Sequence, residues 1–579
     1  MTMLTKWGAV LDRSCPLPEY PRPQLRRESF YNLNGVWDYA VTPSGDEPEV
    51  WDGEIVVPFS PEAPLSGAAR GPAKDEYLHY RRGFTLPEGF QKSRVLLHFG
   101  AVDQIAEVFV NGVSAAKHSG GYWPFSADIT SLLREGENIL RVTVRDNADD
   151  PTFAYGKQRY KRGGMWYTAQ SGIWQTVWLE SVPEVYVKSL RITPEFDEAR
   201  VRIELETALE SSAAITCDVR AADGSFVAGS WAKGGVCVVP LPGFRAWTPD
   251  DPYLYTLDIT CGEDRVESYF AMRKFSYVEL GGRKVFGLNN APLFHNGLLD
   301  QGYYPDGLLT PPSDEAMVND IETMKRCGFN MLRKHIKIEP LRWYYHCDRL
   351  GMIVWQDMVS GGQPYSFLHV SALPTLGKVD LPDQDAKHYG RSGVLSRARF
   401  RREMADTVRL LYNCPCIALW TVFNEGWGQF DALDMANELK KLDPTRFIDH
   451  ASGWQDQGYE EMKSRHIYFR PVKLKNDGRA LALTEYGGYI LAVDGHRWTD
   501  KVFGYRICRD SAALAHDYEK LMLGQVLPHI RKEGLTAAVY TQITDVEEEL
   551  NGLMTYDREV LKIPEETLRE INAALRFDA

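Results

Sequence analysis

Short apolar segments with alternating polar positions dominate the first 277 residues of the chain. Such alternation, together with many β-branched residues, is typical of strands that bury one face. Asn111-Gly112 follows one of these segments and favours a tight hairpin turn. We therefore predict a β-rich region, whose clearest strands are Ser93–Phe99, Ala106–Val110 and Asn138–Val144.

The β-rich region divides near Ser181-Val182-Pro183. Residues 1–182 are predicted to form a first β-sandwich. Residues 183–277 have the length of one immunoglobulin-like β-sandwich, roughly 90 to 100 residues. The predicted strands of this second unit include Leu190–Thr193, Val201–Leu205 and Tyr253–Leu257.

Apolar runs alternate with helical stretches after Lys284. Eight runs are predicted to be strands: Pro292–Leu299, Phe329–Arg333, Met352–Trp355, Ile417–Phe423, Phe447–His450, Ile467–Phe469, Leu481–Thr484 and Ala537–Ile543. Helical stretches lie between several of them, at Asp314–Cys327, Arg397–Tyr412 and Ala432–Leu442. This pattern favours a (β/α)8 TIM barrel over residues 278–579, with an active site at the carboxyl ends of its strands.

Two glutamates end apolar strands of the predicted barrel. Glu425 follows the fourth strand, directly after Asn424, and Glu485 follows the seventh. An ionised carboxylate is disfavoured in a buried run. Either glutamate alone could cap a helix or form an ion pair, but two on one rim indicate catalysis. Cleavage of a glycosidic bond with retention needs two carboxyl groups about 5–5.5 Å apart, one as acid/base and one as nucleophile.

The segments around these glutamates resemble glycoside hydrolase family 2, the β-galactosidase and β-glucuronidase family. Asn424-Glu425 is similar to the family's acid/base motif, and Thr484–Gly487 is similar to its nucleophile motif. The resemblance covers essentially the whole chain, through Gly120–Phe125, Asp128–Thr130, Ser171–Gln175, Gly328–Asn330, Arg333 and Cys347–Gly351. It implies an N-terminal jelly-roll sandwich, an immunoglobulin-like sandwich and a TIM barrel. It also implies Glu425 as acid/base, Glu485 as nucleophile and Asn424 as the ligand of the sugar 2-hydroxyl.

The resemblance implies further roles for three residues at strand ends. Arg333 would be a positive group near the nucleophile, His335 would contact the sugar, and Tyr468 would hydrogen-bond the nucleophile. A structural histidine is the alternative for His335, and ordinary packing is the alternative for Tyr468.

Aromatic and polar residues beyond other strand ends are candidates for sugar contacts. Trp454 or Trp498 is predicted to stack on a sugar face, because an indole suits apolar C–H groups. Asp300, Gln542 and Asp545 are candidates for hydroxyl contacts, with a helix cap as an equal explanation for Asp545.

Three departures from the family pattern bear on the substrate. Glu549-Leu550-Asn551 stands where β-glucuronidases of the family carry an Asn-x-Lys pair, so an acid there would repel a uronate. Gly488 stands where large β-galactosidases have a histidine, and Ser360–Gln363 lacks their magnesium ligands. We therefore expect an exo-acting enzyme for neutral sugars, β-galactosidase-like by default, with no required metal and no cofactor.

Other functions remain open from the residues alone. A β-mannosidase, an arabinosidase or, against the charge argument, a β-glucuronidase would share the fold. A non-catalytic carbohydrate-binding protein is the alternative of a different class, and the intact pair of Glu425 and Glu485 favours an enzyme.

Composition limits the partners and the location. A net charge of −13 disfavours nucleic acid, and no segment approaches the roughly 20 apolar residues of a membrane span. Nine scattered cysteines predict buried free thiols and a cytoplasmic protein. The expected partner is an oligosaccharide or glycoside, with a homo-oligomer left open. The long segments Val359–Gly393 and Tyr489–Arg509 are predicted to shape the pocket or an oligomer contact.

Overall fold

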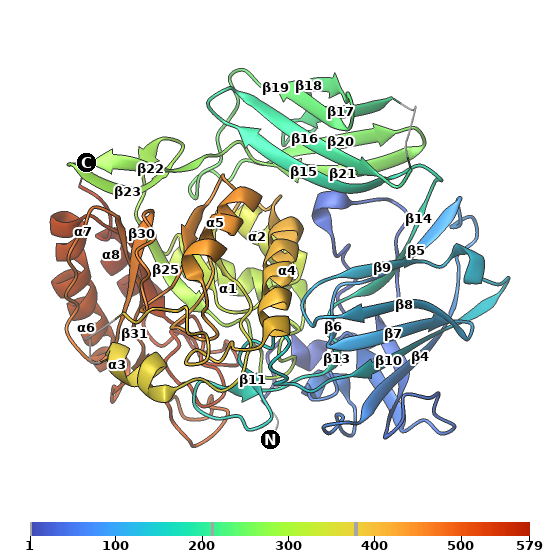
Figure 1. The fold of residues 1–579 in the computed structure, drawn as a ribbon, viewed down its shortest axis with the longest axis horizontal. Helices are drawn as coiled ribbons and strands as arrows, with labels where there is room; N and C mark the ends of the chain where they lie inside the picture. The colour runs from blue at the N-terminus through green and yellow to red at the C-terminus, as the bar shows by residue number, and fades with distance from the viewer. Residues whose placement is uncertain (1–2, 210–213, 376–379, 579) are drawn as a thin grey trace.

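The computed structural model describes residues 3–209, 214–375 and 380–578. Two β-sandwiches lie beside a barrel of parallel strands with helices outside it (Figure 1). The predicted multidomain architecture of jelly-roll, immunoglobulin-like sandwich and TIM barrel is confirmed. The predicted boundary at residues 277/278 falls inside a strand, β22 (Phe275–Leu280), and remains a prediction.

The first sandwich packs two antiparallel sheets around an apolar core that includes Trp37, Val57 and Tyr80. Asn111 and Gly112 both have positive φ between β7 and β8, which is the conformation a tight hairpin turn requires. In sheet order, one sheet contains β1 (Tyr31–Asn32), β14 (Val177–Val182), β5 (Arg94–Phe99) and β9 (Phe125–Asp128); the other contains β3 (Gly53–Val57), β2 (Gly35–Thr42), β4 (Tyr77–Thr85), β10 (Glu137–Arg145), β7 (Ile105–Val110) and β8 (Val113–Ser119).

The second sandwich has a separate core, which includes Val201, Val219 and Leu257. Alternation of buried and exposed residues in β20 places one face of that strand in this core. One sheet contains β15 (Val187–Glu195), β16 (Arg200–Thr207) and β19 (Val236–Pro240); the other contains β18 (Phe226–Trp231), β17 (Ile215–Arg220), β20 (Tyr255–Cys261) and β21 (Asp264–Phe270).

The barrel is built from an eight-stranded parallel sheet with the order β29-β28-β27-β26-β25-β34-β31-β30. The two end strands are joined by a side-chain hydrogen bond of 3.0 Å from Ser464 to Asp449, so the sheet closes into a barrel. The strands are β25 (His295–Asp300), β26 (Met331–Lys334), β27 (Ile353–Asp357), β28 (Ile417–Thr421), β29 (Phe447–Asp449), β30 (Met462–Ile467), β31 (Ala480–Gly487) and β34 (Leu535–Thr541).

The helices occupy fewer crossovers than the alternating pattern predicted. The described residues 450–479 carry no helix, so the connections on both sides of β30 are loops. The prediction for the sixth strand was wrong in position: β30 ends at Ile467, where the predicted strand Ile467–Phe469 began. Residues 463–466 of β30 are all polar, which hid the strand from a search for continuous apolar runs. The helices are α1 (Asp314–Arg326), α2 (Leu341–Leu350), α3 (Leu373–Thr375), α4 (Val394–Leu411), α5 (Ala432–Leu442), α6 (Ser511–Leu521), α7 (Leu527–Glu533) and α8 (Glu565–Ala573).

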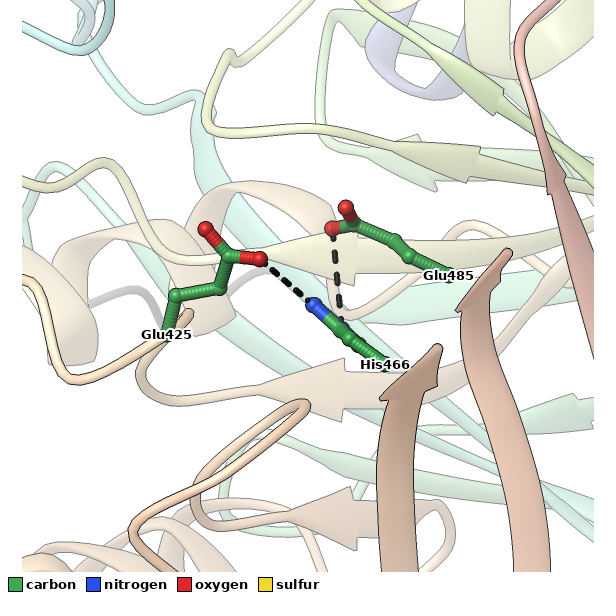
Figure 2. A group of neighbouring side chains, drawn as sticks. All are labelled: Glu425, His466 and Glu485. Atoms are coloured by element: carbon green, nitrogen blue, oxygen red, sulfur yellow. Dashed lines mark hydrogen bonds and ion pairs between the residues drawn. The ribbon is translucent and has the colours of Figure 1, made fainter. Parts of the chain in front are cut away.

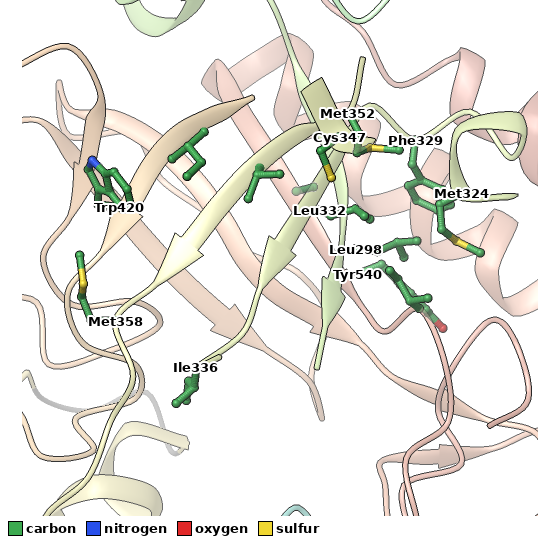
Figure 3. Packing of buried hydrophobic residues seen from close by; sticks show 14 of the residues in the cluster. Leu298, Met324, Phe329, Leu332, Ile336, Cys347, Met352, Met358, Trp420 and Tyr540 are labelled. Carbon is green, nitrogen blue, oxygen red and sulfur yellow. The ribbon is translucent and has the colours of Figure 1, made fainter. Parts of the chain in front are cut away.

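Successive residues of each barrel strand point alternately outward and inward. Leu298 and Leu332 point outward into the layer between strands and helices, where Met324 of α1 packs (Figure 3). Met331 points inward, and the inner position two residues further along β26 is Arg333. The barrel interior is therefore apolar at its amino end and polar at its carboxyl end.

A small sheet closes the amino end of the barrel. It consists of β22 (Phe275–Leu280), β23 (Arg283–Leu288) and β24 (Ala291–Pro292). Phe286 of β23 has no exposed surface and stacks on Phe447 with ring centroids 4.3 Å apart. Its ring also meets the edge of Trp355 at 5.8 Å. This sheet therefore forms an apolar floor at the amino end of the barrel. The polar residues of the barrel interior lie at the opposite, carboxyl end.

Two sequence predictions about the environment can be compared with the structure. No helix in the part of the chain that the structure describes is long and apolar enough to cross a membrane. Eight cysteines are buried and unbridged as predicted, and Cys15 is the exposed exception.

We expect Phe286→Ala to lower the free energy of unfolding by about 3–5 kcal/mol, because it leaves a cavity in the barrel floor. Phe226→Ala, at a side chain 60% exposed, is the control and should change stability by less than about 0.5 kcal/mol. Chemical denaturation measures both, and equal effects of the two substitutions would contradict the role of the floor.

Candidate active site

The inward positions at the carboxyl ends of the strands form a polar layer. Arg333 ends the inner face of β26, and Asp357 ends that of β27. Alternation from Met462 through Ser464 carries His466 inward at the end of β30. The inward position one layer below is hydrophobic for Arg333 (Met331) and Asp357 (Trp355), and it is Ser464 for His466.

Arg333 is fully buried, and all five of its N–H donors are hydrogen-bonded. Its guanidinium binds both oxygens of Asp357 at 3.0 Å. It also donates to Glu485 at 3.1 Å and to Asn424 at 2.8 Å, and a fifth bond of 3.0 Å reaches the carbonyl of Thr484. Arg333, on β26, therefore orients groups from three other barrel strands: β27, β28 and β31.

The backbone of Glu425 lies in the left-handed region, with φ of +52°. This conformation is costly for a residue with a side chain and persists only where neighbours fix it. The Glu425 amide donates to the Ser452 carbonyl at 2.9 Å, and the Trp454 indole donates to the Glu425 carbonyl at 3.0 Å. The loop after β29 thus holds Glu425 in place.

The carboxyl groups of Glu425 and Glu485 face each other across the mouth of the barrel, with His466 between them (Figure 2). One oxygen of each glutamate and one ring nitrogen of His466 all lie within 4.8 Å of one another. The side chain of Glu425 is 12% exposed and that of Glu485 is 7% exposed. This separation matches a retaining pair rather than an inverting pair, whose carboxyl groups stand about 6.5–9.5 Å apart.

The two carboxyl groups have different surroundings. Burial raises the pKa of Glu425 to about 7, against the lowering effect of Lys157 and Arg333, while Glu549 raises it further. Burial also raises the pKa of Glu485, and the charge of Glu425 adds to the rise, whereas His466, Arg333 and the Tyr468 hydroxyl oppose it. Like charges this close disfavour double ionisation, and the hydrogen bonds from Arg333 and Tyr468 favour the charged form of Glu485.

Tyr468 follows β30 and donates a hydrogen bond to Glu485. Tyr505 stacks on its ring with centroids 3.9 Å apart. The segment Tyr489–Arg509 therefore buttresses the nucleophile side of the pocket. On the other side, Tyr365 from the segment Val359–Gly393 stacks on Trp427, with ring centroids 6.3 Å apart.

The first sandwich contributes one wall of the site. The Tyr167 hydroxyl donates to Glu549 in the barrel, and the ammonium of Lys157 lies 5.5 Å from the Tyr167 ring and 5.7 Å from the Trp427 ring. Lys157 is buried, and its ammonium has no hydrogen bond or ion pair with any residue that the structure describes. A second aromatic contact, 5.1 Å between Trp166 and Trp427, closes the wall.

Several residues predicted from the sequence lie at this site. Asn424 accepts from Arg333 and leaves its buried amide nitrogen without a partner among the described residues. His335 contacts Asp357 at 2.7 Å through Nδ1, and burial lowers the pKa of His335 to about 3. Gln542 donates to Asn551 at 2.7 Å. Asn424 and His335 are linked to Glu485 through Arg333 and Asp357.

The structure gives three other predicted residues different surroundings. Asp300 is held in a buried ion pair of 2.7 Å with Lys334. Trp498 stacks under Arg162 at 4.3 Å, and the indole N–H of Trp454 is used to hold the backbone around Glu425. Their proposed contacts with sugar stay predictions.

Sequence reasoning missed four residues of the site: Asp357, His466, Lys157 and Ser452, whose carbonyl accepts a hydrogen bond from the Glu425 amide. Asp357 was detectable, because it ends an apolar strand as a polar residue on the inward phase, whereas the polar sequence of β30 hid His466. Lys157 carried no such signal, because it belongs to the first sandwich and reaches the barrel only in the folded chain.

Glu425, His466 and Glu485 are close enough to serve together as ligands for a metal ion, since histidine and carboxylate side chains both bind Zn²⁺. Among the described residues they are the one such group of three. Occupation by a metal would compete directly with the acid and nucleophile roles predicted for the two glutamates.

Comparison with known protein families gave three matches along the chain. Residues 64–183 match the sugar binding domain of glycosyl hydrolases family 2, residues 185–273 match a second model of that family, and residues 311–475 match its TIM barrel domain.

Two curated relatives illustrate the range of similarity. A β-galactosidase of Thermoanaerobacter pseudethanolicus is 25% identical over 63% of this chain, and the match spans only 47% of that protein. A β-glucuronidase of Paenibacillus borealis is 22% identical over 82% of this chain and 85% of its own length. The chain thus matches less than half the length of the β-galactosidase.

Solved structures share the fold over almost the whole chain. A Ruminococcus gnavus β-glucuronidase in complex with uronic isofagomine has a TM-score of 0.75 at 16% identity, over 97% of this chain and 100% of the other. A family 2 β-galacturonidase from Eisenbergiella tayi has a TM-score of 0.70 at 19% identity, over 97% and 100%.

The charge of Lys157 should be visible in a pH profile. Because its positive charge lowers the pKa of Glu425, we expect Lys157→Met to raise that pKa. The acid form would then persist to higher pH, and the basic limb of kcat/KM would move upward. Lys161→Met, at an exposed lysine four residues along the chain, is the control. A limb that does not move in Lys157→Met would show that the ammonium does not act on Glu425.

Proposed function

Because the chain belongs to glycosyl hydrolases family 2, we propose that it is an exo-acting, retaining β-glycosidase. The observation that carries this proposal is the spacing of Glu425 and Glu485, whose nearest carboxyl oxygens lie within 4.8 Å. The environments of the two groups support one acid and one anion, which is the state that the first chemical step requires.

The proposed reaction is a double displacement. Glu485 attacks the anomeric carbon while Glu425 transfers its proton to the leaving oxygen, so that a glycosyl ester forms and the aglycone leaves neutral. A water molecule then gives a proton to the Glu425 carboxylate and attacks the same carbon, which releases the sugar and frees the Glu485 carboxylate.

Three neighbours would assist the reaction. Arg333 and Tyr468 stabilise the Glu485 carboxylate in the free enzyme through their hydrogen bonds. The unpartnered amide of Asn424 is placed to bind the sugar 2-hydroxyl, a contact that strengthens in the transition state.

We propose a neutral terminal sugar as the substrate, with a β-galactoside as the leading candidate. Glu549 supports this choice, because it is buried beside the pocket and raises the pKa of Glu425, which places its charge near the reacting centre. An acid at this place repels a sugar carboxylate and accepts hydrogen bonds from hydroxyl groups. The unpartnered Asn551 amide supplies a donor nearby.

A β-uronide is a second candidate, favoured by Lys157. Its side chain is buried and its ammonium has no ion pair with a described residue, whereas charges with little exposure are ordinarily paired. A carboxylate on the substrate would supply the missing charge. The β-glucuronidase and β-galacturonidase relatives also support this candidate.

Substitution of the glutamates tests the mechanism. We expect Glu485→Gln to abolish turnover of nitrophenyl glycosides, because the nucleophile is lost. Glu425→Gln should slow substrates with poor leaving groups by about 10²–10⁴-fold and spare activated ones. NMR of the released sugar should show the retained anomer first. Wild-type-like rates in Glu485→Gln, or an inverted product, would refute the proposal.

A matched pair of substrates tests the sugar. Nitrophenyl β-galactoside and β-galacturonide differ only at carbon 6, and we expect higher kcat/KM for the galactoside. Glu549→Gln should improve the galacturonide by about 10-fold, corresponding to about 1.4 kcal/mol of removed repulsion. A wild-type preference for the galacturonide that falls in Lys157→Met would instead establish the second candidate.

A further inference from the structure

His466 contacts both catalytic carboxyl groups from one fully buried ring. Its Nδ1 lies 2.8 Å from Oε1 of Glu425. Its Nε2 lies 3.2 Å from Oγ of Ser452 and 3.6 Å from Oε1 of Glu485. The imidazole therefore spans the gap between the acid/base and the nucleophile (Figure 2).

The ring has no freedom to rotate away from this position. Gly453 has φ of +94°, and a Cβ there would lie 2.5 Å from Cγ of His466, so the backbone of Gly453 packs directly on the ring. The Trp454 indole meets the ring edge at 5.5 Å. A side chain at residue 453 would displace the imidazole.

A register shift in the barrel aligns His466 with the nucleophile. Along β30 and β31, Arg465 pairs with Leu483, but His466 pairs with Glu485. Thr484 is the extra residue in β31, and such a bulge re-aims the side chains that follow it. Without the bulge, Glu485 would not lie opposite His466.

The ring is neutral despite its charged neighbours. Burial lowers the pKa of His466 to about 4, and the charges of Glu485 and Asp357 do not overcome this effect. The charged and titratable groups that face it come from β26, β27, β28, β30 and β31: Arg333, Asp357, Glu425, Arg465 and Glu485. A neutral imidazole has one N–H and one acceptor nitrogen.

We propose that His466 is a positioning residue that accepts a hydrogen bond from protonated Glu425 through Nδ1 and directs its Nε2–H toward Ser452 and ionised Glu485. This inference rests on the proposed roles of the two glutamates.

The proposed tautomer favours one of the two ways in which Glu425 and Glu485 can share a single proton. Nδ1 as acceptor stabilises the acid form of Glu425, whereas Nε2–H stabilises the anionic form of Glu485. If Glu485 held the proton instead, the acceptor nitrogen Nδ1 would face the ionised carboxylate of Glu425. His466 thus favours the ionisation state that begins the reaction, and holds the carboxyl group of Glu425 toward the pocket.

Two substitutions of His466 test the roles of its two ring nitrogens separately. Asparagine places a polar atom near Nδ1, and glutamine places one near Nε2. We expect His466→Asn to keep activity on poor leaving groups within about 5-fold, because its amide oxygen still accepts from Glu425. His466→Gln should lose at least about 10-fold on phenyl glycosides and less than about 3-fold on dinitrophenyl glycosides, which need no acid.

The pH profile gives a second readout of the same pair. Loss of an acceptor for the protonated form lowers the pKa of Glu425, so the basic limb of kcat/KM should move to lower pH in His466→Gln and stay in place in His466→Asn. Equal losses on both substrates in both variants, with an unmoved limb, would overturn the proposal and leave His466 a packing residue.

Nitrogen NMR of histidine-labelled protein tests the tautomer without any substrate. At pH 7 the signals that disappear in His466→Asn should be those of a neutral ring with its proton on Nε2. A proton on Nδ1, or a charged ring, would overturn the inference. This measurement remains decisive even if no glycoside is hydrolysed, which would refute the proposed function instead.

Discussion

The catalytic end of the barrel depends on a guanidinium group that has no contact with solvent. A buried charge of this kind is tolerated only when every donor is satisfied and the charge is balanced. Arg333 meets this condition through Asp357, Glu485, Asn424 and the Thr484 carbonyl. Because these partners come from different strands, closure of the barrel and construction of the site are one event. A strand that shifted by one residue would leave an unpaired ion in the interior.

Much of the fold was predictable because it follows from side-chain periodicity. The alternation in β5, β7 and β10 and the apolar runs of seven barrel strands gave elements close to those observed. The exception, β30, has Lys463 and Arg465 on its outer face, so its buried face was hidden among charged residues. The helix-free connections around β30 were not predictable, since nothing in a short loop sequence states that a helix is absent.

The candidate site was predictable only where it is local in sequence. Glu425, Glu485 and Arg333 each follow an apolar strand, which marks the rim of a barrel. The proposed function of His466 depends on the bulge at Thr484 and on contact with Gly453. Neither feature produces a repeating pattern of polar and apolar residues in the sequence. Lys157 depends on docking of a separate domain. Residues whose roles arise from register or docking lie beyond what a single sequence can reveal.

The hydrogen bond between Tyr167 and Glu549 joins residues 382 positions apart. During synthesis the first sandwich is therefore complete long before its partner in the barrel leaves the ribosome. The pocket gains its full wall only when β34 and the loop after it pack against the first sandwich. Selection can consequently alter the wall through the sandwich, without touching the strands that hold the reacting carboxyl groups. The two parts of the site can evolve at different rates while the chain remains one cooperative assembly.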